Sequence, residues 1–82
     1  FFRSDYVQSN IMKICKRRRE SFIKEAELFS LAKDELKNRF EVEKPLFSTS
    51  IEKLVKNDYL EKREVNITGD GSDIVTEYKY LA

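Results

Sequence analysis

The last third of the chain contains the feature that most limits its fold. Two runs rich in β-branched and aromatic residues, 61–67 and 74–81, flank residues 68–73, which contain both glycines of the protein. Glycine takes the positive φ angles of tight turns at little cost, whereas β-branched and aromatic side chains favour strands. This arrangement predicts a β-hairpin at the end of a chain whose earlier segments have helical spacing.

Apolar residues recur with the period of a helix near the N-terminus. Val7, Ile11 and Ile14 form the centre of one stripe between residues 4 and 18, as expected of a helix that buries one face. Ser4 is the expected N-cap residue. Lys13 and Lys16 fall outside the stripe, and we expect both to face solvent.

Two further helices are expected. The first covers residues 25–38 and the second residues 50–58, where Thr49 and Glu52 have the spacing of a capping box. Between the first two helices, residues 21–23 break the period and predict a very short strand. The apolar faces contain Leu28, Phe29, Ala32 and Leu36 in one helix, and Ile51, Leu54 and Val55 in the other.

Three helices closed by a β-hairpin form the winged-helix plan, a variant of helix-turn-helix. The expected fold is therefore an α+β winged helix, with residues 1–82 as a single domain. A plain helical bundle with a frayed tail is the alternative, and the glycine-containing turn between two β-prone runs argues against it. The chain begins with Phe rather than Met, so we expect a C-terminal fragment of a longer protein.

The composition argues against several functional classes. The chain has no histidine and a single cysteine, so a zinc site, a disulfide and a histidine-dependent catalytic centre are all disfavoured. We expect no metal, no cofactor and no enzymatic activity. A lone thiol fits a reducing compartment, here the cytoplasm and nucleus. No apolar run approaches the length of a membrane span. Charged residues make up 38% of the chain, yet the net charge is only +1, so total charge does not indicate a nucleic-acid partner.

Four segments together resemble the C-terminal domain of cullins, the scaffolds of multi-subunit ubiquitin ligases. Ile11-Met12-Lys13 matches the cullin IMK triplet, and residues 22–40 are similar to the second cullin helix without gaps. Residues 57–62 and 78–82 resemble the closing segment of cullins, including its C-terminal end. Each motif is short, but their order makes the set fairly specific.

The resemblance implies a function. The lysine of the IMK triplet in cullins accepts a Nedd/Rub-type ubiquitin-like modifier, which activates the ligase, so Lys13 is the expected acceptor. A short insertion follows Lys13, and Cys15 stands where cullins have arginine, so Lys16 is the second choice. The longer wing indicates a divergent cullin. The implied partners are a RING-box protein, the modifier and its conjugating enzyme with a helper, and the deconjugating and exchange factors.

The basic run of residues 16–19 has three interpretations: a solvated helix end, a protein contact through Arg17, Arg18 and Arg19, or a nucleic-acid contact. Met12, off the apolar stripe, is a further possible partner contact. The alternative function is a nucleic-acid-binding winged helix. It is disfavoured because the outward side of the third helix contains Glu52, Lys53, Lys56 and Asp58 but no arginine. Cys15 lies at the edge of the stripe and is expected to be packed and inert.

Overall fold

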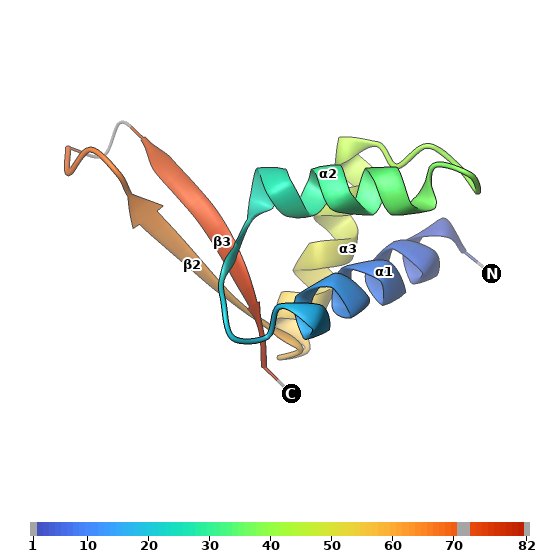
Figure 1. The fold of residues 1–82 in the computed structure, drawn as a ribbon, viewed down its shortest axis with the longest axis horizontal. Helices are drawn as coiled ribbons and strands as arrows, with labels where there is room; N and C mark the ends of the chain where they lie inside the picture. The colour runs from blue at the N-terminus through green and yellow to red at the C-terminus, as the bar shows by residue number, and fades with distance from the viewer. Residues whose placement is uncertain (1, 71–72, 82) are drawn as a thin grey trace.

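The computed structural model describes residues 2–70 and 73–81 and contains three helices and a three-stranded antiparallel sheet (Figure 1). In chain order the elements are α1 (Arg3–Arg17), β1 (Ile23–Lys24), α2 (Glu25–Leu36), α3 (Lys44–Lys56), β2 (Leu60–Asn66) and β3 (Ile74–Tyr80). The predicted α+β winged-helix fold is confirmed. No helix in the described ranges is long and apolar enough to cross a membrane.

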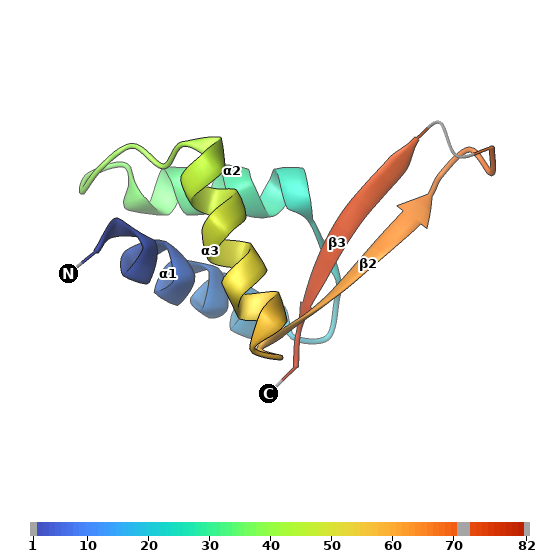
Figure 2. The ribbon, with the colours of Figure 1, turned by 180° about the vertical axis from the view of Figure 1, so that it is seen from behind.

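The helices pack together, and the β2–β3 hairpin extends away from them as the wing (Figures 1 and 2). The strand order is β1-β3-β2, so the last strand of the chain is the central one. Ile23 of β1 pairs with Tyr78, and Leu60 of β2 pairs with Tyr80. The short strand before α2 therefore joins the wing to the helices.

The core forms where the three helices meet the base of the sheet. The predicted stripe of α1 is confirmed, since Val7, Ile11 and Ile14 are at most 1% exposed. Phe47 of α3 is fully buried, and its ring lies 5.1 Å from that of the partly buried Phe29. Burying these apolar faces is the main source of stability for a domain of this size. The remaining core residues are Cys15, Ile23, Leu28, Ala32, Leu36, Val42, Ile51, Leu54, Leu60 and Tyr78.

Several predicted element boundaries are wrong. The third helix begins at Lys44, six residues before the predicted start, so Thr49 lies inside the helix and is no N-cap. Pro45 is in its first turn, where a missing N–H costs nothing and the fixed φ suits a helix. Phe2, not Ser4, occupies the N-cap of α1, and no side chain caps that helix. The second helix ends at Leu36, and the short strand lies at residues 23–24.

A Schellman motif turns the chain from α3 into β2. Asp58 has a φ of 61°, and the N–H groups of Asp58 and Tyr59 donate to the carbonyls of Val55 and Leu54 at 3.1 and 2.9 Å. At the far end of the wing, Gly69 has a φ of 82°. The hairpin is confirmed, although residues 71 and 72 of the predicted turn lie outside the described residues.

Candidate functional site

Helix α1 presents Lys13 and Lys16 on the side opposite its buried stripe. Both lysines are exposed, as predicted, while Ile14 and Cys15 between them are buried. Together with Arg17, the two lysines line a shallow depression. Within residues 2–70 and 73–81, neither lysine forms an ion pair or a side-chain hydrogen bond. Each therefore presents a free ammonium group on a helix whose other face is fixed in the core.

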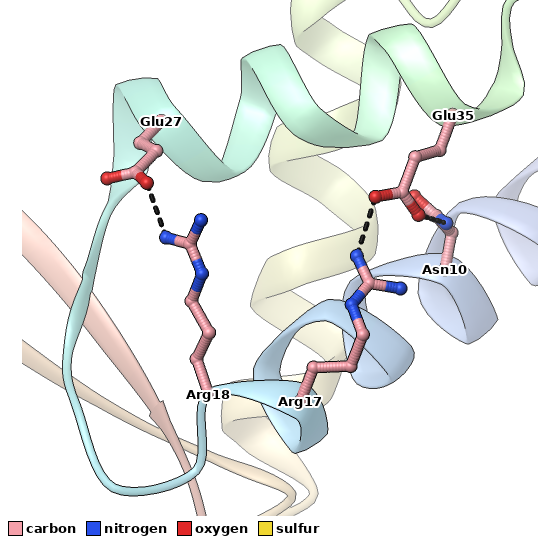
Figure 3. Close-up of polar contacts among 5 residues, drawn as sticks. All are labelled: Asn10, Arg17, Arg18, Glu27 and Glu35. Carbon is pink, nitrogen blue, oxygen red and sulfur yellow. Dashed lines mark hydrogen bonds and ion pairs between the residues drawn. The ribbon is translucent and has the colours of Figure 1, made fainter.

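A polar cluster beside these lysines joins α1 to α2 (Figure 3). Glu35 accepts a hydrogen bond from Asn10 Nδ2 at 2.9 Å on Oε1, and Arg17 donates to its Oε2 at 2.6 Å. Two opposing effects act on the pKa of the Glu35 carboxyl. Partial burial is the largest single effect and raises this pKa. The hydrogen bonds from Arg17 and Asn10, together with the positive charge of Arg17, lower it by more, so the pKa lies below its usual value. Glu35 is therefore a carboxylate at neutral pH, and both of its oxygens are engaged.

A second ion pair crosses between the same two helices. Arg18, the first residue after α1, donates to Glu27 of α2 (Figure 3). The chain then turns at once, because the N–H of Ser21 donates to the Arg18 carbonyl at 2.9 Å. This turn leads from the end of α1 toward β1. Arg19 is exposed and has no ion-pair partner among the described residues.

These contacts divide the basic run of residues 16–19 into two pairs. Arg17 and Arg18 are bound to carboxylates of the same chain, whereas Lys16 and Arg19 have no such partner in the described part of the structure. Only the second pair is free to contact another molecule without first breaking an internal ion pair. Sequence reasoning missed Glu35 altogether. The signal that could have pointed to it was Asn10, a polar residue within an otherwise apolar stripe.

Two neighbours of Lys13 have packing roles. Met12, off the stripe, is partly buried and packs against the core, so only part of its side chain is available for contact. Cys15 is buried, as predicted, and desolvation raises the pKa of its thiol to about 11. A buried thiol in its neutral form is a poor nucleophile. The described residues contain no cluster of His, Cys, Asp or Glu able to hold a metal.

The outward side of α3 has a mixed charge, as expected from the sequence. Glu52, Lys53 and Lys56 are exposed, and Asp58 follows the helix. A helix that reads DNA bases usually presents arginine or amide side chains toward the major groove. This surface offers an acid between lysines instead, so the structure adds no support for a recognition helix.

Comparison with known proteins identifies the family. Residues 2–66 match the model of the cullin protein neddylation domain. A solved structure of a Dcn1(P)–Cdc53(WHB) complex, described under a dual E3 mechanism for Rub1 ligation to Cdc53, shares the fold. Its TM-score is 0.75 at 22% identity, and the match covers 98% of this chain and 80% of that chain. No curated protein matches. The family match extends over most of the sequence and includes α1, α2, α3 and β2, and the chain therefore belongs to the cullin neddylation-domain family.

Proposed function

We propose that this chain is the C-terminal module of a cullin scaffold and that it accepts a Nedd/Rub-type ubiquitin-like modifier on Lys13. The observation that supports this most strongly is the position of Lys13 within a cullin neddylation domain. Its side chain is exposed and unpaired among the described residues, on a helix whose neighbouring positions are buried. Lys16 is the second choice because it is also exposed, about one turn further along α1.

The chemistry asked of Lys13 is an acyl transfer. The modifier arrives with its C-terminal carboxyl group as a thioester on a conjugating enzyme. The Lys13 ammonium first gives up one proton, and the neutral Nζ attacks the thioester carbonyl. A C–N isopeptide bond forms, the C–S bond breaks, and the sulfur leaves as a thiolate that takes the second proton lost by the nitrogen. No oxidant or metal takes part in this balance.

The domain supplies position rather than catalysis. An ordinary lysine has a pKa of about 10.4 and is protonated at neutral pH, so a base must remove its proton. Among the described residues, the carboxylates of Glu35 and Glu27 are each paired with an arginine, and the Cys15 thiol is buried. These groups are therefore poorly suited to act as that base. We therefore assign the base to the conjugating enzyme. The fixed helix lowers the entropic cost of placing the amine at the thioester.

The partners follow from the same proposal. We expect a RING-box protein, the modifier's conjugating enzyme with its helper, and the deconjugating and exchange factors. The similar Cdc53 domain is described with Dcn1 and Rub1 ligation, which supports a partner of this pathway. Lys16, Arg19 and the accessible part of Met12 remain available for such contacts. Attachment of the modifier would activate the ligase in the cytoplasm and nucleus.

A reconstituted modification assay tests the proposal. The full-length parent scaffold, bound to its RING partner, is compared with its Lys13→Arg and Lys16→Arg variants. Loss of the modified band in Lys13→Arg alone is the expected result, since arginine keeps the charge but forms no isopeptide bond. Loss in Lys16→Arg alone would move the acceptor by one turn. A wild-type scaffold that stays unmodified, while the same enzymes modify a control cullin, would refute the acceptor role.

A further inference from the structure

Glu35 of α2 contacts residues of α1 that precede and follow Lys13 along the helix. Asn10, Lys13 and Arg17 stand at positions i, i+3 and i+7 of α1 and so lie along one side of the helix. The first and last of these residues both contact Glu35 (Figure 3). Along the helix axis Lys13 lies between them, and around the axis it is about 60° from Asn10 and 40° from Arg17, on the side away from the buried stripe. A lysine has a flexible four-carbon stem, and we infer that the Lys13 ammonium can swing toward the same carboxylate when no other cation occupies it.

An ion pair between Lys13 and Glu35 would oppose modification. A carboxylate beside an ammonium group stabilises the charged form, and only the neutral amine attacks a thioester. The pair would also draw the side chain toward α2 and away from solvent. Glu35 is thus a potential inhibitor within the domain, unless another cation occupies it.

Arginine is a better partner for the Glu35 carboxylate than lysine is. Its guanidinium remains protonated at all physiological pH values, and its fork matches the geometry of a carboxylate better than a lysine does. In the structure Arg17 holds one oxygen of Glu35 at 2.6 Å and Asn10 holds the other at 2.9 Å. The side chain of Glu35 is 30% exposed, so water screens this pair less than it screens a fully exposed one.

We propose that Arg17 is a positioning residue, which keeps Glu35 occupied and thereby leaves the amine of Lys13 free to accept the modifier. This inference rests on the proposed function of Lys13. Arg17 lies about one turn beyond Lys13 on α1, in the last turn of the helix. Arg17 touches neither the modifier nor the thioester in this proposal and acts only through Glu35.

The test measures initial rates of modification of the full-length scaffold with its RING partner, at subsaturating conjugating enzyme. Arg17→Ala frees Glu35 to pair with Lys13. An exposed lysine–glutamate pair changes an equilibrium by up to about fivefold, so the rate should fall about two- to fivefold. Glu35→Gln removes the competing acid. The double variant Arg17→Ala/Glu35→Gln should therefore recover the wild-type rate, although it lacks the ion pair.

That rescue separates positioning from a merely structural role. If the Arg17–Glu35 pair only held α1 against α2, the double variant would be as slow as Arg17→Ala, and this outcome would overturn the inference. Arg18→Ala is the matched control, since it breaks an ion pair of the same kind with Glu27 and lies about 140° around the helix from Lys13. Its rate should equal that of the wild type.

The outcomes also distinguish this inference from the function on which it rests. A wild-type scaffold modified on Lys13, with an unchanged rate in Arg17→Ala, refutes the positioning role alone. A wild-type scaffold that takes no modifier, or takes it only on Lys16 as mapped by mass spectrometry, refutes the Lys13 assignment and this inference with it. Thermal melts of each variant show that rates are compared between folded proteins.

Discussion

Replacing Asn10 with aspartate would place a second carboxylate against Glu35. Asn10 is 8% exposed, and its Nδ2 donates to Glu35 Oε1 at 2.9 Å. Its Oδ1 is buried without a hydrogen-bond partner among the described residues. Asn10→Asp removes the donor and substitutes a negative charge of almost the same shape. The packing volume is almost unchanged, so the variant tests the lost hydrogen bond and the added charge together, and Asn10→Leu measures the hydrogen bond without the charge.

The loss of folding stability caused by Asn10→Asp can be estimated in two ways. Two like charges about 4 Å apart repel by roughly 4 kcal/mol at an effective dielectric constant of about 20. Protonating one carboxyl instead costs about 4 kcal/mol at pH 7, because its ordinary pKa lies some three units lower. Arg17 attracts both carboxylates and offsets part of either cost. We expect a loss of about 2–4 kcal/mol, against a total stability of roughly 4–12 kcal/mol for a domain of this length.

The loss should depend on pH. In the folded variant the carboxyl pair holds a proton to a higher pH than in the unfolded chain, so the folded state binds more protons. Stability relative to wild type therefore falls as the pH rises above the unfolded pKa, about 4, and the loss nearly disappears below that pH. In the wild-type protein the sign is opposite, because the pKa of Glu35 is lowered by folding. Its contribution is present above the unfolded pKa and is lost as the pH falls.

Urea unfolding followed by circular dichroism, at pH 7 and at pH 3.5, measures the loss of stability and its dependence on pH. Asn10→Leu is the first control: it loses one hydrogen bond but also removes the unpaired Oδ1, so its stability should stay within about 1 kcal/mol of wild type. Ser9→Asp adds the same charge at the adjacent exposed position and should change little. A loss below 1 kcal/mol at pH 7 for Asn10→Asp, or an equal loss at both pH values, would refute the reasoning.

Three further predictions concern the packing of the domain. Thr49→Ala should leave the free energy of unfolding unchanged or slightly raised, because Thr49 lies inside α3; a loss near 1 kcal/mol, typical of a missing N-cap, would contradict the observed helix start. Cys15 should react with a maleimide at pH 8 far more slowly in the native protein than in urea, since its pKa is raised to about 11 by burial; rapid native labelling would disprove this. Phe47→Ala should lower stability by about 3–5 kcal/mol in a chemical melt, and a loss under 1 kcal/mol would show that its pocket is loosely packed.

The sequence determined the parts of this protein that depend on local spacing. The stripe of Val7, Ile11 and Ile14 predicted both the buried face of α1 and the exposure of Lys13, because helical geometry fixes which side chains share a face. The β-prone runs around the glycine-containing turn predicted the wing for a similar reason. The family resemblance followed from short motifs in the right order.

Helix ends were harder to predict, because competing start signals are close in energy. Thr49 with Glu52 has a valid capping-box spacing, yet the helix starts at Lys44 with Pro45 in its first turn. The earlier start brings Phe47 into the helix and into the core, where burying an aromatic side chain contributes more than a cap of about 1 kcal/mol. The choice between the two starts therefore depended on packing against the rest of the domain.

Only the tertiary structure decided what surrounds helix α1. Glu35 is 18 residues from Arg17 and 25 from Asn10 along the chain, and no local period relates them. The pairing of Ile23 with Tyr78 is likewise a long-range contact. Such contacts depend on how helices and strands dock, and docking is set by the fit of whole apolar faces rather than by the spacing within one segment. The sequence could therefore place Lys13 on the surface, whereas the fold alone brought Arg17 and Glu35 together beside it.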